Sequence, residues 1–344
     1  MISKSHDMSR SLLCLSVFTC FSIALLCLCF FACFPSSAGA TDFYVFYLGG
    51  QSNMDGYGQA SELPADLQGE VERVPIFHGN KSADCTPVDG RGMWTTLRPG
   101  HGFGFKSDGK KVTYSDRIGI ELTFARRLQE LLPDKRIALI KYSRGGTSID
   151  EDAAGRFGCW EPDFEQGEGE GHGINQYDHF LATIRYAMSD SDINDDGETD
   201  RLIPAGIIWM QGESDAAYTA EIADRYEAHL KRLMDLMRAA LRSDDLPVVI
   251  GRISDSGQDD DDGQVWEHGD TIRTAQAAFV KKDGHAALVT NTDEYGYSDR
   301  WHYDTAGYID LGQQFAEAWL SISEMNMPQQ ENASGGNSES STDP

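Results

Sequence analysis

The sequence predicts an α/β fold in which a central parallel sheet is covered by helices on both faces. Two observations favour this class. Short apolar strands alternate with longer amphipathic helices, and glycine-rich or polar turns follow several of the strand ends. Helices of this length suit the crossovers that parallel strands require. The residues that remain after an N-terminal leader suffice for one large domain.

Five segments have the composition of buried strands. Each is rich in Val, Ile, Leu or aromatic residues and is bounded by Gly, Pro or Asp. Strands of a parallel sheet are buried on both faces, so continuous apolar runs are expected of them. The predicted strands are 43–48, 136–142, 205–210, 247–252 and 286–290.

Five further segments have the apolar spacing of amphipathic helices. In the first of them, Ile118, Leu122, Ala125 and Leu128 recur at intervals of three or four residues. The predicted helices are 116–132, 176–188, 219–242, 269–281 and 305–321. Segments 53–115 and 150–175 are rich in glycine and weakly periodic, so we expect them to form loops that wall a pocket.

The first forty residues are predicted to lie outside the fold. Lys4 and Arg10 precede a long apolar stretch, 12–34, and small residues at 38–40 end it. This order is typical of a secretory signal peptide cleaved before Thr41. The stretch is longer than most signal cores, so an uncleaved membrane anchor is the alternative.

We therefore expect one large folded domain at 41–325. Residues 326–344 are rich in Ser, Asn, Gly and Glu and contain little that could bury apolar surface, which predicts a disordered tail. The chain has 55 acidic and 29 basic residues, a net charge of −26. Such an acidic surface argues against nucleic acid and against an anionic membrane as partner once the leader is removed.

Five of the seven cysteines lie in the leader, which leaves Cys85 and Cys159 in the exported part. Two cysteines in an exported protein predict one disulfide, and two unpaired thiols are the alternative. Without a matching histidine pattern, the pair is a poor zinc site.

Candidate catalytic residues occur at two distant places. Ser52 follows the apolar run 43–48 and two glycines, which places its hydroxyl in a tight turn just past a strand end, where a parallel sheet exposes its chemistry. A serine needs a base to become nucleophilic. Asp299 precedes His302 by three residues, a spacing at which the carboxylate can reach Nδ1 and leave Nε2 for a serine.

Two further strand ends carry hydrogen-bond donors. The first is the double glycine Gly145-Gly146, and the second is the run Gln211-Gly212-Glu213. Together with Gly50-Gln-Ser-Asn-Met54 and Asp299-x-x-His302, these blocks resemble the SGNH hydrolase superfamily. Within it they are similar to the sialate O-acetylesterase-like group, which includes the acetylxylan esterases of carbohydrate esterase family six. The matches occur in the family's order and span about residues 43–320.

The resemblance implies a three-layer, flavodoxin-like α/β/α fold and assigns roles by position. Ser52 would be the nucleophile, His302 the base and Asp299 its orienting acid. The oxyanion hole would use the amide of Ser52, a glycine amide of the 145–146 pair, with Gly146 as the donor and Gly145 as support, and the side chain of Gln211. The asparagine donor that the superfamily carries after the glycine of its third block is replaced here by Glu213 and Ser214, and whether Glu213 supports the triad stays open.

A different chemistry is suggested by the acidic run at 192–200. Asp192, Asn194, Asp196 and Asp200 have oxygen ligands at calcium-loop spacing, with a glycine at 197. Ile203 stands where such a loop carries a bidentate Glu, so a solvated acidic turn is the alternative. Any calcium there would be structural, because a serine esterase needs no metal or organic cofactor for its chemistry.

The sequence thus predicts an exported serine esterase that removes acetyl groups from a carbohydrate. One alternative keeps the same triad for lipid or thioester acyl groups, and another is a carbohydrate-binding protein on an inactive esterase fold. The acetylated carbohydrate is the expected partner. Trp301, between Asp299 and His302, is the tryptophan expected at the pocket, whereas Trp209 is expected in the core.

Overall fold

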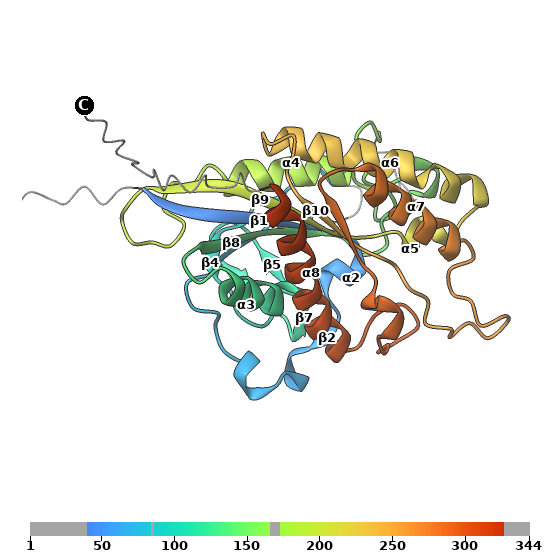
Figure 1. The fold of residues 1–344 in the computed structure, drawn as a ribbon, viewed down its shortest axis with the longest axis horizontal. Coiled ribbons are helices and arrows are strands. Elements are labelled where there is room, and N and C mark those ends of the chain that lie inside the picture. Colours follow the sequence, from blue (N-terminus) through green and yellow to red (C-terminus); the bar gives the residue numbers. More distant parts are fainter. Residues whose placement is uncertain (1–39, 84–85, 166–172, 327–344) are drawn as a thin grey trace, which may run out of the picture. The chain divides into compact units, whose positions relative to one another are not determined.

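A seven-stranded sheet forms the centre of the computed structural model, which describes residues 40–83, 86–165 and 173–326 (Figure 1). The strand order is β11-β10-β9-β1-β8-β3-β4. Strand β1 pairs in parallel with β8, as do β8 with β3, β9 with β10 and β10 with β11, whereas β4 runs antiparallel to β3. The strands are β1 (Thr41–Gly50), β3 (Pro75–His78), β4 (Trp94–Thr96), β8 (Arg136–Ser143), β9 (Asp200–Met210), β10 (Val248–Gly251) and β11 (Ala286–Val289).

Helices cover both faces of this sheet. Figure 1 shows α4 and α6 on one face and α3 and α8 on the other; α3 packs against α8, and α6 against α7. The three-layer α/β/α prediction is therefore confirmed. The helices are α2 (Ser52–Asp55), α3 (Glu121–Leu131), α4 (Gln176–Ala187), α5 (Glu213–Ala216), α6 (Ala220–Ala240), α7 (Gly269–Lys282) and α8 (Thr305–Asn326).

Short elements fill the connections. Two small two-stranded sheets are formed by β2 (Gly58–Gln59) with β7 (Arg117–Ile118), and by β5 (Lys106–Ser107) with β6 (Val112–Thr113). Turns of 3₁₀ helix occur at Ala60–Glu62, Ala65–Leu67, Glu151–Ala153 and Asn291–Glu294. Every helix among the described residues is too short or too polar to span a bilayer.

Strand β1 shows why its sequence is apolar throughout. Successive side chains of a strand point to opposite faces of a sheet. Phe46 packs edge-on against Phe124 of α3 and Trp319 of α8, with ring centroids 5.3 and 4.9 Å away. Its neighbour Tyr47 packs against Phe180 of α4 at 4.8 Å. The central strand therefore contributes to both apolar layers, which explains a run without polar alternation.

The structure departs from the predicted elements at three places. Helix α3 begins at Glu121 and not at 116, because Arg117–Ile118 pairs with Gly58–Gln59 as β7. Strand β9 extends back to Asp200. The segment 53–115, predicted as loops, contains β3 and β4 of the main sheet, whose four and three residues are too few to stand out beside many glycines.

The ends of the central strands meet at one edge of the sheet. The Gln51 amide donates to the carbonyl of Met210 at 2.9 Å, and the Arg144 amide donates to that of Gly50 at 3.1 Å. At Gly50, where φ is +138°, a Cβ atom would lie 1.9 Å from the Met210 oxygen, so only glycine permits this crossing. Because β8 and β9 flank β1 on opposite sides, this is a topological switch point, where open α/β sheets bind ligands.

A buried lysine holds the turn after β1 in place. Lys141 of β8 is fully buried, and its Nζ lies 2.7 Å from a Glu121 carboxylate oxygen. The same ammonium donates to the carbonyls of Asp55 and His101, each at 3.0 Å. Breaking such a buried pair by removing one partner is strongly destabilising, because the other charge is left without compensation.

Buried histidines should make the stability of the protein depend on pH. Burial lowers the pKa of His179 to about 4, and burial with the nearby Lys141 charge lowers that of His101 to about 3. In the unfolded chain each takes up a proton near pH 6.5. Below that pH the unfolded state binds more protons than the folded state, so the free energy of unfolding falls by about 1 kcal/mol per pH unit for each such histidine until its folded pKa is reached.

We expect His179→Gln to reduce this slope by about 1 kcal/mol per pH unit between pH 6 and 4.5, because one buried, uncharged imidazole is removed. Urea unfolding of the variant and the wild-type protein across that range measures the difference. The carboxylates titrate in the same way in both proteins, so their contribution cancels from the difference in slope. If the free energy of unfolding falls with pH at the same slope in both proteins, His179 is protonated in the folded state over this range.

Candidate functional site

The first residue of the short helix α2 is Ser52, which the turn after β1 presents to a cavity. The Gln51 carbonyl accepts hydrogen bonds from the amides of Met54 and Asp55, each at 2.9 Å, which closes this turn. Ser52 is 7% exposed and lines a cavity of about 1060 Å³. The hydroxyl thus lies at the sheet edge where the strand ends meet.

His302 lines the same cavity and is oriented by Asp299. The carboxylate Oδ2 of Asp299 lies 2.8 Å from His302 Nδ1, while its Oδ1 accepts from the amides of Trp301 and His302 at 2.8 and 2.9 Å. Burial opposes ionisation of Asp299, but these hydrogen bonds and the charge of His302 outweigh it and lower its pKa. The carboxylate therefore stays ionised and holds the ring with Nε2 directed away from it.

An aromatic stack fixes the plane of the imidazole. The ring of Tyr57 lies parallel to that of His302, with an interplanar angle of 3° and centroids 3.6 Å apart. Phe103, which also lines the cavity, stacks against Tyr57 with ring centroids 4.7 Å apart. Trp301 is 48% exposed and lines the cavity, whereas Trp209 is fully buried in the core. The cavity thus offers apolar ring faces next to the serine and histidine.

The double glycine after β8 approaches the serine closely. A Cβ atom on Gly145 would lie 3.1 Å from the Cβ of Ser52, so a larger residue would crowd the nucleophile. Gly146 has φ of +71°, lines the cavity and is exposed. The Gly145 amide donates to Asp55 at 3.3 Å. Gly146 is therefore the glycine whose amide can donate a hydrogen bond to an anion in the cavity.

Asp55 is a structural partner of the site that the sequence did not indicate. Its carboxylate accepts from Ser143 Oγ at 2.7 Å as well as from Gly145, and it pairs with Lys81, which lines the cavity. It therefore joins the nucleophile turn to the double-glycine turn. The position of Asp55, three residues after Ser52, was the available signal in the sequence. Its hydrogen-bond and ion-pair partners, however, lie tens of residues away along the chain.

Gln211 is not brought to the cavity, which corrects the oxyanion role predicted for its side chain. It is fully buried, and its Nε2 donates to the Thr147 carbonyl at 3.1 Å and to Asp215 at 2.5 Å. Its Oε1 lies 3.0 Å from the Tyr226 hydroxyl. The physical reason is the buried carboxylate of Asp215, which accepts a hydrogen bond from the side-chain amide of Gln211 that the resemblance assigned to the oxyanion.

Glu213 supports the histidine loop indirectly, through Asn53. Its Oε1 accepts from Asn53 Nδ2 at 2.7 Å, and the same nitrogen lies 3.2 Å from the Trp301 carbonyl. Burial raises the pKa of Glu213, and its Oε2 has no hydrogen-bond partner among the described residues. In the described part of the chain Glu213 makes no hydrogen bond or ion pair with His302, so Asp299 is the carboxylate placed to orient the ring.

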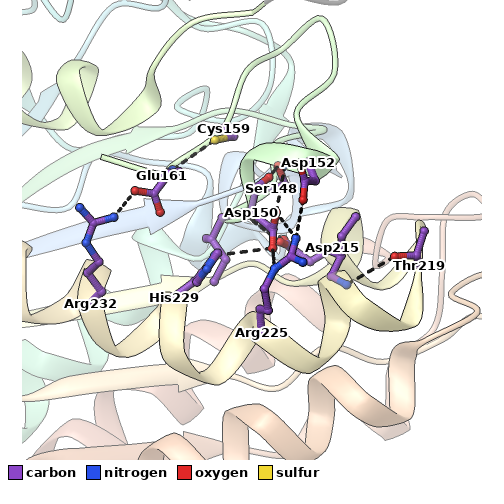
Figure 2. A network of polar contacts seen from close by, with 12 residues as sticks. Ser148, Asp150, Asp152, Cys159, Glu161, Asp215, Thr219, Arg225, His229 and Arg232 are labelled. Carbon is purple, nitrogen blue, oxygen red and sulfur yellow. Dashed lines mark hydrogen bonds and ion pairs between the residues drawn. The ribbon is translucent and has the colours of Figure 1, made fainter. Parts of the chain in front are cut away.

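A polar network anchors the cavity wall that follows β8 (Figure 2). Arg225 of α6 binds both Asp150 and Asp152, and Arg232 binds Glu161. Asp215, whose pKa is raised to about 7 by burial, accepts from the amides of Ile149 and Asp150 at 3.1 and 3.0 Å. These contacts hold segment 148–161, whose residues 155–157 line the cavity.

A second serine and histidine lie beside the same cavity. Ser82 lines it, and its Oγ lies 2.9 Å from His179 Nε2. The Nδ1 of this histidine has no partner in the described part of the chain. Without an orienting carboxylate, and with its pKa lowered to about 4 by burial, His179 is a much weaker base than a catalytic histidine requires.

The disulfide, the leader and the tail remain predictions from the sequence. Cys85 lies outside the described residues, while Cys159 is buried and in no disulfide among them. The leader at 1–39 and most of the tail, 327–344, are also outside them.

The calcium prediction also remains a prediction. In the 192–197 turn, the side chains of Asp192, Asn194 and Asp196 accept from nearby backbone amides. Asp200 accepts from the amide of Ile193 at 2.8 Å. Across the described residues, no group of three or more His, Cys, Asp or Glu side chains is placed to hold a metal ion. Calcium binding by this turn is therefore not supported by its arrangement and rests on the sequence pattern alone.

Asp299→Asn should lower kcat by about 1,000-fold to 10,000-fold while leaving the fold intact, because an amide favours the wrong imidazole tautomer. Glu213→Gln should lower kcat less than about tenfold, since Glu213 contacts Asn53 and not the ring. Steady-state kinetics on an aryl acetate, with urea unfolding as the control for folding, compares the two. A larger loss in Glu213→Gln would transfer the orienting role to Glu213.

Comparison with known proteins finds solved structures of similar fold. The fold is similar to that of a protein from Arabidopsis thaliana, with 21% identity and a TM-score of 0.54, over 82% of this chain and 99% of that one. It is also similar to a carbohydrate acetylesterase from Xanthomonas citri, with 19% identity and a TM-score of 0.57, over 82% of this chain and 56% of that one. A third similar structure is NanS, with 16% identity and a TM-score of 0.51, over 83% of this chain and 99% of that one.

These likenesses show the fold, and a search of curated proteins found no match. Family membership comes from a sequence profile, which covers most of the chain. The profile described as "Carbohydrate esterase, sialic acid-specific acetylesterase" matches residues 42–321. The chain belongs to this family of carboxylic ester hydrolases.

Proposed function

We propose that this protein removes O-acetyl groups from a carbohydrate through an acetyl-enzyme formed on Ser52. The observation that carries the proposal is that Ser52 and His302 line one cavity at the switch point of the sheet, with Asp299 bound to His302 Nδ1. Family membership supports acetyl-ester hydrolysis, and the site supplies a nucleophile, a base and an acid that orients the base.

In the proposed reaction, Ser52 Oγ attacks the acetyl carbonyl and His302 Nε2 takes the hydroxyl proton. The tetrahedral oxyanion receives hydrogen bonds from the amides of Ser52 and Gly146. Collapse breaks the ester bond, and His302 returns the proton to the leaving sugar oxygen. Water then attacks the acetyl-enzyme by the same path, releasing acetate and restoring Ser52. Each oxyanion donor in hydrolases of this kind contributes about 3–4 kcal/mol to transition-state stabilisation.

The cavity favours an acetylated sugar that also carries negative charge. Its lining includes Lys81, Lys106, Arg144 and Arg156 but only one carboxylate, Asp55. This excess of cations contrasts with a chain of net charge −26. Cationic side chains in a cleft raise the local concentration of anionic substrate. The family description, which names sialic acid, is consistent with an anionic sugar.

Aromatic side chains provide the apolar part of the same cavity and suit the faces of a sugar ring. They come from the connections that follow β1, β4, β8, β9, β10 and β11, so the binding surface is assembled from across the fold. The aromatic residues of the lining are Tyr57, Phe103, Phe105, Phe157, Tyr218, Trp266 and Trp301.

We further propose that the protein is exported, through the leader at residues 1–40. Export would bring the enzyme to acetylated glycans outside the cell. The alternatives of a lipid or thioester acyl hydrolase and of a non-catalytic carbohydrate-binding protein are separated by two results. Preference for acetyl over longer acyl esters argues against the first, and any turnover that depends on Ser52 argues against the second.

Replacing Ser52 by alanine should abolish acetate release from an aryl acetate, because no other nucleophile in the cavity has an oriented base. Ser82→Ala is the matched control, since Ser82 lines the same cavity and its hydroxyl also contacts a histidine, and it should retain kcat within about threefold. Measured kcat values for the two purified variants test this. Full activity in Ser52→Ala, or loss only in Ser82→Ala, would contradict the nucleophile assignment.

The proposed charge preference predicts that Arg156→Gln raises KM about tenfold for an O-acetylated sialic acid, with kcat unchanged, because a charge-assisted hydrogen bond is lost from substrate and transition state alike. A neutral acetylated xylo-oligosaccharide should show no change. Lys110→Gln, on the exposed turn that follows β5 and outside the cavity lining, is the control. Equal effects on both substrates would reject a role for charge.

A further inference from the structure

We propose that the ring of Tyr57 stabilises the imidazolium that His302 becomes during the reaction, so that Tyr57 is a positioning residue that acts through the base. The inference rests on the proposed serine mechanism, in which His302 Nε2 holds a proton during both acylation and deacylation. The ring of Tyr57 lies parallel to the imidazole, with centroids 3.6 Å apart and an interplanar angle of 3°. An aromatic face is negative and attracts a cation placed over it.

The backbone that carries Tyr57 is fixed next to the nucleophile. The amide of the preceding residue, Gly56, donates to the Ser52 carbonyl at 2.9 Å, so Tyr57 directly follows the turn that presents the serine. The Tyr57 carbonyl accepts from Arg117 Nη1 at 2.7 Å, and its ring also stacks on Phe103 at 4.7 Å. The ring is therefore in place before the proton moves, and no rearrangement is needed when the charge develops on the imidazole.

Tyr57 acts on the imidazolium as a neutral ring. Burial, together with the carboxylates of Asp55 and Asp299, raises the pKa of Tyr57, so its hydroxyl stays protonated at the pH of the reaction. That hydroxyl lies near the nucleophile, since a Cβ atom on Gly145 would lie 3.7 Å from it and 3.1 Å from the Cβ of Ser52. A test of the ring face must therefore separate the face from the hydroxyl.

The charges around the imidazole stay in place when only Tyr57 is changed. Carboxylates among them favour the imidazolium and cations oppose it, so a comparison of variants at position 57 cancels their contribution. Glu213 of α5 contacts the histidine loop only through Asn53. The charged groups that bind His302 or share its cavity are Asp299 on its own loop, Asp55 in α2, Lys81 after β3, Lys106 in β5, and Arg144 and Arg156 after β8.

The test measures kcat/KM for an aryl acetate against pH. Tyr57→Leu removes the ring face, so the imidazolium becomes less stable and the acidic limb of the profile should move to lower pH by about 0.5–1 pH unit. For the same reason kcat should fall about threefold to tenfold. Tyr57→Phe keeps the face without the hydroxyl and should hold the limb within about 0.2 pH unit and kcat within about twofold.

The direction of the shift separates this role from simple packing. A ring that only shielded the imidazole from water would give the opposite sign, because water admitted by the smaller leucine favours the charged form and moves the limb to higher pH. Tyr57→Met, with a longer and more adaptable side chain, should repeat the result of Tyr57→Leu, and urea unfolding midpoints control for folding.

Nuclear magnetic resonance of protein with isotope-labelled histidine rings follows the same ionisation without turnover, and the His302 signal is identified by its absence from His302→Gln. The inference is overturned if Tyr57→Leu and Tyr57→Met leave this ionisation and the acidic limb at the wild-type pH or move them higher. It is also overturned if Tyr57→Phe shifts them as far as Tyr57→Leu does. Activity that persists in Ser52→Ala would instead overturn the serine mechanism itself.

Discussion

The buried ammonium of Lys141 is the constraint on which the site depends. It joins a carboxylate of α3, the carbonyl that ends the nucleophile turn and the carbonyl of His101. A single charge in the apolar interior therefore fixes three segments that are remote in sequence. Such a charge is tolerated only when its hydrogen bonds are satisfied, so the turn that carries Ser52 is coupled to the integrity of the sheet.

From that anchor, each functional group is positioned through its neighbours. Asp55 ties the serine turn to the double glycine, and Asn53 ties it to the histidine loop and to Glu213. Gln51 ties it to the start of α5. Three residues of this turn thus connect the nucleophile to the double glycine, the histidine loop and the start of α5. Such preorganisation lets donors act on developing charge without rearrangement.

The sequence predicted the layers and the family because both depend on local signals. Apolar runs such as that around Phe46 mark strands buried on both faces, and the glycine-bounded motifs lie at strand ends. It missed β3 and β4, which are held mainly by pairing with other strands. It also assigned an oxyanion role to Gln211, whose amide is taken up by Asp215. Contacts such as Lys141 with Asp55, 86 positions apart, have no local pattern that would reveal them.

The central claim is that Ser52 is the nucleophile, and covalent labelling tests it most directly. The protein is treated with a fluorophosphonate, which forms a stable adduct with an activated serine, and the modified peptide is identified by mass spectrometry. The account predicts one phosphonyl group per molecule, on Ser52, with loss of esterase activity in proportion to labelling. Complete inactivation with the label on Ser82 or any other residue would contradict it.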